Sequence, residues 1–327
     1  MKSTVAQLLL VAAFGSSAVA QQQRPLALSS AGQIVSAEIS RPLLLPIQCD
    51  RDGNIYVRGY QFPNPQLAPI MRISPKGVKE AEFSAGEFKE GTPSEAFDFV
   101  VLPDGEVLQA IGVRPTDLYV VRFRRDGRIV STTRIEQPMM PYRMAPLGGD
   151  SFLLSGTTLA SKDKPETQSI TAIYGSTGTL VRKLEPIHTK DKTPVESLST
   201  SDFGTFLSAP DGKLLFVERA PNPHVRSIGA DGTTSTLFRI ASPESDMKAE
   251  TTKWSAGRLY TQFMSIDSEG SIKKTLYTVT DGSTGDLVAT YQLPEQTGAA
   301  FACVDSEGFT FLNGKDGKIV LTRIPFR

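Results

Sequence analysis

An internal repeat of about 50 residues runs through this chain of 327 residues. Each copy holds a short run of β-branched and aromatic residues, a turn centred on glycine and a second such run, as in IQCDRDGNIYVRG from Ile47 and TFLSAPDGKLLFVE from Thr205. Apolar residues that alternate with polar ones on both sides of an Asp-Gly or Lys-Gly pair predict two antiparallel strands joined by a tight turn. The turn glycines of six such hairpins are Gly53, Gly105, Gly149, Gly212, Gly257 and Gly308.

A second series of hairpins lies between the members of the first and shares its period. It includes LYVVRFRRDGRIVSTTRI from Leu118 and HVRSIGADGTTSTLFRI from His224. Each repeat therefore contains four strands, and no segment shows a sustained helical period. Four strands in about 50 residues form the unit of a β-propeller, so we expect an all-β, six-bladed β-propeller of four-stranded antiparallel blades. The turn glycines of the second series are Gly77, Gly127, Gly178, Gly232 and Gly285.

The two ends of the chain complement each other. After the sixth hairpin of the first series, KIVLTRIPFR from Lys318 supplies one more strand and leaves the last blade a strand short. The segment 32–40, GQIVSAEIS, has the pattern of the missing strand, and pairing it there would leave no free sheet edge in the ring. A seven-bladed ring and tandem β-sandwich domains are the alternatives, but sandwich domains would not make the two end fragments complementary.

The first 20 residues have the features of a secretory signal peptide. Lys2 gives a positive start, residues 5–14 form an apolar run, and residues 15–20 end in small side chains. A buried helix or a membrane anchor is the alternative, but spanning a bilayer takes about 20 apolar residues, and three glutamines follow the short run. We expect residues 1–20 to be removed and residues 21–327 to form a single propeller domain in the periplasm or outside the cell.

The charges of the chain balance. The chain has 35 basic residues (lysine and arginine) and 35 acidic residues (aspartate and glutamate), so its formal net charge is zero. Because affinity for nucleic acids and anionic membranes depends on positive charge, we expect neither as a partner. No stretch after the signal peptide is long and apolar enough to span a membrane, so we expect a soluble monomer.

One repeat matches a known consensus in its letters. CDRDGNIYVRG from Cys49 resembles the NHL-repeat consensus, in which Asp, Gly and a Tyr-Val pair mark the inner hairpin, and SAPDGKLLFVE from Ser208 is a looser match. The chain as a whole resembles a divergent NHL-like or TolB-like six-bladed propeller of bacterial export. The resemblance implies a scaffold that binds protein, peptide or glycan. The same superfamily includes metal-dependent lactonases and phosphotriesterases, so fold alone does not decide function.

The first strand of each propeller blade lines the central channel. The loops that join blades, and the loops between second and third strands, lie on one face, which we call the loop face. The Asp-Gly turns lie on the opposite face, where acids such as Asp52, Asp104, Asp211 and Asp231 are expected to serve turn geometry rather than metal binding. Six positions, each seven residues before a glycine of the first series, start the inner strands and form what we call the mouth ring: Pro46, Asp98, Tyr142, Thr205, Glu250 and Phe301.

Two acids in the mouth ring raise the alternative of a cation site, which would make the protein a lactonase-like hydrolase or lyase. Such a site would bring the oxygens of Asp98, Asp202 and Glu250 to a common point, as Ca²⁺ requires. Lactonase-like members hold their metal with Glu, Asp and Asn, and the four asparagines of this chain lie in a turn, between prolines or at a strand end. We therefore expect no cofactor, and Ca²⁺ is the alternative.

Nucleophilic and nucleotide chemistry have weaker support in the sequence. The two histidines, His188 and His224, have no catalytic partner at a recognisable spacing, and both are expected in solvated loops. The chain has no P-loop, dinucleotide fingerprint, CxxC or HExxH motif. The sequence therefore favours a binding role over an enzymatic one.

The loop face carries the residues most typical of recognition. Segments such as GYQFPNPQLAP from Gly59 and EQPMMPYRM from Glu136 combine aromatic residues, Met and Arg with stiffening prolines. Packing between blades is the alternative role, above all for Met139 and Met140. We expect a peptide, protein or glycan ligand where these loops meet the channel. The expected ligand-binding residues are Tyr60, Phe62, Asp98, Tyr142, Arg143, Asp202, Phe203 and Arg219.

The two cysteines, Cys49 and Cys303, fall on the inner strands of the first and last blades, which the ring makes neighbours. In an exported protein an even number of cysteines is compatible with a disulfide. The alternative is two buried thiols one register apart, because Cys49 precedes its turn glycine by four residues and Cys303 by five. The sequence leaves both possibilities open.

Overall fold

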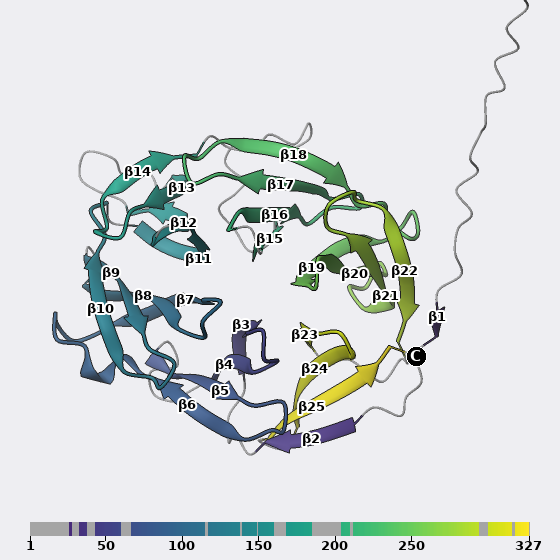
Figure 1. The fold of residues 1–327 in the computed structure, drawn as a ribbon, viewed down its shortest axis with the longest axis horizontal. Coiled ribbons are helices and arrows are strands. Elements are labelled where there is room, and N and C mark those ends of the chain that lie inside the picture. The colour runs from purple at the N-terminus through teal and green to yellow at the C-terminus, as the bar shows by residue number, and fades with distance from the viewer. Residues whose placement is uncertain are drawn as a thin grey trace, which may run out of the picture.

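The computed structural model shows a ring of six β-sheets around a central axis (Figure 1). The all-β, six-bladed propeller expected from the repeat is confirmed. Among the described residues, no helix has the length and apolar character needed to cross a membrane. The residues that the structure describes are 26–27, 33–37, 43–59, 67–114, 117–137, 139–148, 150–159, 168–184, 204–209, 212–293, 300–315 and 318–326. The expected signal peptide, Tyr60, Phe62, Asp202 and Phe203 lie outside them.

The first three blades follow chain order, each from an innermost strand at the axis to an outermost strand at the rim (Figure 1). A 3-10 turn, η2 (Ala85–Glu87), lies between the first two blades. Blade 1 consists of β3 (Leu43–Cys49), β4 (Ile55–Gly59), β5 (Ile70–Ile73) and β6 (Lys79–Phe83), blade 2 of β7 (Glu95–Val101), β8 (Val107–Arg114), β9 (Asp117–Phe123) and β10 (Ile129–Arg134), and blade 3 of β11 (Met139–Leu147), β12 (Ser151–Thr158), β13 (Ser169–Tyr174) and β14 (Leu180–Lys183).

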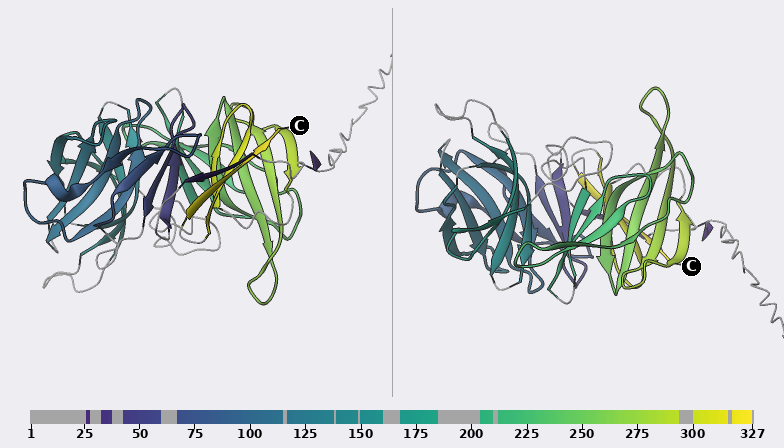
Figure 2. Two further views of the ribbon diagram at one scale, coloured as in Figure 1. Left: turned by 90° about the horizontal axis from the view of Figure 1, so that it is seen from below. Right: turned by 90° about the horizontal axis from the view of Figure 1, so that it is seen from above.

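The next two blades repeat this order, and the sixth takes only three strands from the C-terminal segment. Figure 2 shows the ring from two edges, with many strands inclined to the ring axis, as expected from the twist of β-sheets. Blade 4 consists of β15 (Gly204–Ser208), β16 (Leu214–Glu218), β17 (His224–Ile228) and β18 (Thr234–Arg239), blade 5 of β19 (Lys248–Ser255), β20 (Arg258–Ile266), β21 (Ile272–Asp281) and β22 (Leu287–Gln292), and blade 6 begins with β23 (Ala300–Val304), β24 (Gly308–Lys315) and β25 (Lys318–Pro325).

An N-terminal strand completes the sixth blade. Strand β2 (Gln33–Ala37) pairs antiparallel with β25, and Figure 1 shows the two strands side by side although they come from opposite ends of the chain. The expected closure by segment 32–40 is therefore confirmed for residues 33–37, the part of the segment that the structure describes. A two-residue strand not expected from the sequence, β1 (Leu26–Ala27), adds parallel to β22 at the rim of blade 5.

The glycine turns adopt the backbone that the Asp-Gly pairs predict. Gly53, Gly105 and Gly127 have φ angles of 77°, 82° and 90°, in the left-handed region that glycine occupies without steric cost. Gly308 is an exception, because it begins β24 and a Cβ atom there would lie 2.2 Å from the carbonyl oxygen of Ile324. Glycine at this position is required by the close approach of β25 rather than by turn geometry.

The hydrophobic core lies between neighbouring blades, since each sheet packs against a neighbour on both faces. Strand β16 is consequently buried at every residue, and its sequence LLFVE is a continuous rather than an alternating run. Between blades 1 and 2, Tyr56, Phe83 and Phe99 are fully buried. Each such side chain contributes roughly 1.5–3 kcal/mol when it is removed from water, so packing between blades holds the ring together.

The seam between the first and last blades is cross-linked. Cys49 on β3 and Cys303 on β23 form a disulfide whose Cα atoms are 6.0 Å apart and whose half-cystines are 254 residues apart in the chain. Nearby, the Nζ of Lys253 on β19 donates a hydrogen bond of 3.0 Å to the carbonyl oxygen of Ile47 on β3. Blade 5 thereby reaches blade 1 past the intervening blade 6. Burial lowers the pKa of Lys253 to about 8.

Candidate functional site

Backbone bulges mark the mouth ring. Five of the six innermost strands shift register where they begin: β3 between Leu44 and Gln48, β7 between Ala96 and Phe99, β11 between Pro141 and Arg143, β19 between Ala249 and Thr251, and β23 between Phe301 and Cys303. Strand β15 pairs without such a shift. Bulges re-aim side chains and are common beside functional sites. Four mouth-ring positions lie within these shifts: Pro46, Asp98, Tyr142 and Glu250. The innermost strands are therefore irregular at the positions counted back from the turn glycines.

Asp98 is a buried carboxylate at the start of blade 2. The residue is only 6% exposed, and one side-chain oxygen, Oδ2, accepts a hydrogen bond of 2.8 Å from the backbone N–H of Met144 in blade 3. The other oxygen, Oδ1, is buried without a hydrogen-bond partner in the described part of the chain. Burial raises the pKa of Asp98 to about 6, although the positive charges of Arg143 and Arg58 oppose the shift. The mouth ring therefore contains an acceptor that the protein leaves unsatisfied.

Arg58, which the sequence reasoning missed, holds the bulge that carries Asp98. Its guanidinium donates hydrogen bonds to the carbonyl oxygens of Ala96, at 2.7 Å, and of Phe97. Burial lowers the pKa of Arg58, and the nearby charge of Asp98 opposes this. An arginine from blade 1 thus fixes the backbone of blade 2, and Asp98 bonds to the backbone of blade 3. No motif signals this role, because it depends on the neighbouring blade.

Tyr142 and Arg143 begin blade 3. Tyr142 is 40% exposed, and its hydroxyl lies 3.3 Å from Oγ1 of Thr157. Arg143 is half-buried, and its charge lowers the pKa of Asp98. The neighbouring methionines differ in role. Met139 packs in the core between blades 2 and 3, whereas Met140 is exposed, as a recognition surface requires.

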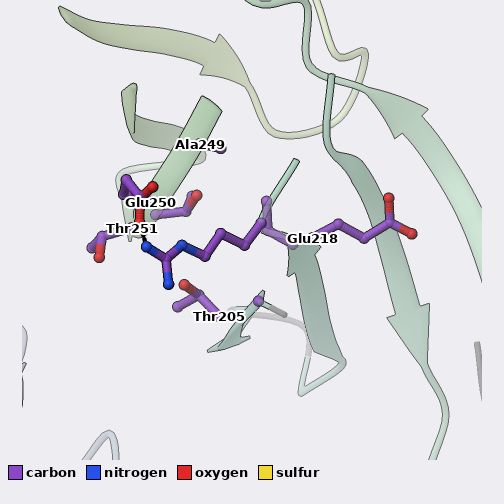
Figure 3. Close-up of a pocket in the computed structure, with 9 residues that line it drawn as sticks. Thr205, Glu218, Ala249, Glu250 and Thr251 are labelled. Carbon is purple, nitrogen blue, oxygen red and sulfur yellow. Dashed lines mark ion pairs between the residues drawn. The ribbon is translucent and has the colours of Figure 1, made fainter. Parts of the chain in front are cut away.

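A shallow hollow without internal space for a water molecule lies at the start of blades 4 and 5. Arg219, at the end of β16, forms an ion pair with Glu250 in the bulge of β19, and the two side chains are 26% and 11% exposed. In Figure 3 Thr205 and Thr251 lie beside this pair, whereas the carboxylate of Glu218 points away from it. Oε1 of Glu250 is buried and accepts no hydrogen bond from the described residues. Three mouth-ring or expected site residues, Thr205, Arg219 and Glu250, therefore meet here.

Glu218 anchors a separate network on the outer side of blade 4. Its carboxylate accepts hydrogen bonds from Arg226, at 2.9 and 3.1 Å, and lies 2.8 Å from Nδ1 of His224. The Nε2 of His224 lies 3.1 Å from the guanidinium of Arg239. The expectation of a solvated loop is wrong for His224, because it begins strand β17 and its ring is held by these partners.

Two of the expected turn acids serve turn geometry, since Oδ1 of Asp104 and Oδ1 of Asp231 each accept the backbone N–H two residues later at 3.0 Å. The expectation is wrong for Asp52, which pairs with Arg125 of the neighbouring blade at 2.8 Å, and the backbone N–H groups of its turn donate to Asp50 instead. Asp211 lies outside the described residues. No group of three His, Cys, Asp or Glu residues in the described ranges could hold a metal ion. Since Asp202 lies outside those ranges, the calcium alternative stays untested.

The arrangement defines the chain as a six-bladed β-propeller with polar groups concentrated at one end of its innermost strands. The chain is similar to a protein of unknown function from Dyadobacter fermentans DSM 18053, at 11% identity over 90% of this chain and 98% of that one, with a TM-score of 0.52. This similarity supports the fold alone.

Two other solved structures are less similar. A protein of unknown function from Bacteroides caccae matches at 14% identity over 81% of this chain and 83% of that one, with a TM-score of 0.45. The Dos1 propeller matches at 11% identity over 83% of this chain and 75% of that one, with a TM-score of 0.42. No protein-family model matches the sequence, and no curated protein matches it.

Proposed function

We propose that the protein is a binding scaffold whose ligand, a peptide, protein or glycan, binds at the mouth ring on the loop face. The observation that carries this proposal is the pair of buried acceptor oxygens, Oδ1 of Asp98 and Oε1 of Glu250, which have no hydrogen-bond donor in the described ranges. A buried polar atom without a partner costs about 1–3 kcal/mol. A ligand that supplies donors at the mouth ring would recover this free energy.

The side chains beside these acceptors fit a recognition surface. Tyr142 presents an exposed aromatic ring at the mouth. Arg143 is half-buried, and Arg219 is partly exposed in its ion pair with Glu250. Tyrosine and arginine are the residues most enriched where binding free energy is concentrated. The hollow at Glu250 is a shallow depression without internal space, unlike the roughly 300–1,000 Å³ of sites that enclose a small molecule. A surface that engages part of a larger ligand therefore agrees best with the described residues.

We further propose that the protein is exported after removal of residues 1–20. The disulfide between Cys49 and Cys303 supports this, because disulfides persist in oxidising compartments. N-terminal sequencing of the protein recovered from the periplasm or medium of an expressing bacterium is expected to begin at Gln21. Recovery of the intact chain from the cytoplasm alone would contradict export.

Binding to arrayed glycans and arrayed peptides tests the scaffold. The Tyr142→Ala/Arg143→Ala variant is expected to lose at least about tenfold in affinity for whichever array members bind the wild type. Arg128→Ala is the matched control, because this arginine is 78% exposed in an Asp-Gly turn on the opposite face. Binding that is weakened by Arg128→Ala and not by the mouth variant would overturn the proposal.

The calcium alternative is tested by thermal unfolding in Ca²⁺ and in EDTA. A cation that binds only the folded protein must raise its melting temperature. The scaffold proposal expects the same melting temperature in both solutions. A higher melting temperature in Ca²⁺ would favour a cation site that includes Asp98, Asp202 and Glu250.

A further inference from the structure

The hairpin of strands β20 and β21 projects from the loop face at blade 5. In Figure 2 this hairpin, in yellow-green, extends past the ends of the neighbouring strands. Strand β19 pairs with β20 only as far as Met264, and β22 pairs with β21 only as far as Leu276. Beyond these points, residues 265–266 of β20 and 272–275 of β21 pair only within the hairpin. The end of the hairpin is therefore a two-stranded ribbon whose outer edges pair with no other strand of the described chain.

The ribbon is held in place at its turn and at its base. Oδ1 of Asp267 accepts hydrogen bonds from the backbone N–H groups of Glu269, at 2.9 Å, and of Ser271, at 2.8 Å. At the base, Lys274 forms an ion pair with Glu244, which lies in the loop between blades 4 and 5. These contacts fix the ribbon before any ligand arrives, so a ligand that binds it loses less free energy to ordering the protein.

The ribbon exposes an apolar pair and a free cation. Ile266 and Ile272 lie directly opposite each other and are 51% and 59% exposed. Directly opposite residues share one face of a sheet, where a further strand covers them. Lys273, the next residue of β21, is exposed and has no ion-pair partner in the described ranges. The acids of the hairpin, Asp267 and Glu269, lie in the turn rather than along this edge.

The free edge of β21 lies in line with the outermost strand of its blade. Strand β21 has ten residues and β22 has six, so the edge of residues 272–275 continues past the end of β22. Backbone N–H and C=O groups along such an edge can pair with another strand. Blade 6 already takes its outermost strand, β2, from a distant segment of the chain. This fold therefore accepts an outermost strand that no hairpin connects to the blade.

We propose that residues 272–275 bind an extended acidic segment of a partner protein as an added β-strand. An apolar side chain of the segment covers Ile272 and a neighbouring carboxylate pairs with Lys273, so the segment alternates the two types. A second copy of this chain is a less suitable occupant, because pairing two such edges brings Lys273 and Lys274 of both copies together. The inference goes beyond the proposed function, since this hairpin lies outside the mouth ring.

Fluorescence anisotropy with synthetic peptides tests the chemistry of the edge. The probe is a labelled peptide of alternating valine and glutamate, about six residues long as in an ordinary strand. The wild type is expected to bind it at least about tenfold more tightly than a peptide of alternating valine and lysine. The acidic peptide with N-methylated backbone lacks donors for the edge and is expected to bind at least about tenfold more weakly. No binding of the acidic peptide, or equal binding of all three, would overturn the proposal.

Variants of the hairpin locate the site. Ile272→Thr keeps a β-branched residue in the strand and removes the apolar cover, and it is expected to weaken binding of the acidic peptide about tenfold. Leu287→Thr is the matched control, because Leu287 is 46% exposed on β22 of the same blade and lies away from the ribbon. Lys273→Glu is expected to reverse the preference in favour of the valine–lysine peptide. All three variants are expected to melt as the wild type does.

The alternatives have distinct outcomes. Binding that is unchanged in both Ile272→Thr and Lys273→Glu would overturn the hairpin site and leave the array test of the mouth ring unaffected. Loss of binding in Tyr142→Ala/Arg143→Ala alone would place the peptide at the mouth ring and also overturn the hairpin site. Light scattering of the free protein tests the second copy, since a dimer that Ile272→Thr converts to a monomer would overturn the peptide as the occupant.

Discussion

At the scale of single residues, Asp98 shows how the fold creates a chemically distinct group. The carboxylate is enclosed by the start of two blades, and Arg58 and Arg143 offset only part of the cost of its burial. A folded-state pKa of about 6 instead of the ordinary value of 3.8 corresponds to roughly 3 kcal/mol at neutral pH. The ionised form of Asp98 therefore destabilises the folded protein.

The sign of this effect gives a pH dependence. Because the pKa of Asp98 is raised on folding, the folded protein binds more protons than the unfolded chain between about pH 4 and pH 6. The contribution of Asp98 to the free energy of unfolding falls as the pH rises through this window. Asp98→Asn is expected to be more stable than the wild type at pH 7.5, by up to about 3 kcal/mol, and by only about 1 kcal/mol at pH 4.5. Urea unfolding at the two pH values measures this, and a difference that does not change with pH would contradict it.

Sequence reasoning located candidate site residues, but it did not identify the residues of neighbouring blades that hold them in place. Counting back from the turn glycines located Asp98, Tyr142 and Glu250 correctly at the strand starts, because the repeat fixes equivalent positions in every blade. It could not find Arg58, whose bonds to Ala96 and Phe97 cross between blades. Such contacts depend on the packing of sheets rather than on any local pattern.

At the scale of strands, the hairpin pattern predicted nearly every element, since alternation and turn chemistry are local properties of the chain. The bulges were not predictable, because a register shift depends on what the neighbouring blade offers to the displaced backbone. Strand β1 was also missed, since two residues carry no period. The closing strand β2 was found only because the repeat left the last blade one strand short.

Strand β2 provides a prediction at this scale. A chain that starts at Pro42 lacks β2 and exposes the edge of β25, which is paired to β2 from Gln33–Arg323 to Ala37–Ile319. An open edge of this kind promotes aggregation. We expect a large fall in melting temperature or aggregation, measured by thermal unfolding and light scattering. A chain that starts at Gly32 is the control, because it loses β1 and keeps β2. Equal melting of the two chains would contradict closure by β2.

At the scale of the whole molecule, the disulfide joins the first blade to the last. The chain-entropy model assigns about 5 kcal/mol to closing a loop of this length. Cys49→Ser/Cys303→Ser is expected to lower the free energy of unfolding by an amount of this order, with no further effect of a reducing agent. Thiol titration of the denatured, unreduced wild type is expected to find no free thiol. Two free thiols would show that the seam is not cross-linked.

The central claim is that the ligand binds at the mouth ring, and amide hydrogen exchange measures this most directly. The exchange of the protein is compared with and without the array member that binds most tightly, since bound segments open less often. We predict protection in residues 139–144, 219–224 and 240–250, which lie at the loop face, and unchanged exchange in the Asp-Gly turns 124–128 and 229–233. Protection confined to those turns would place the ligand on the opposite face and contradict the account.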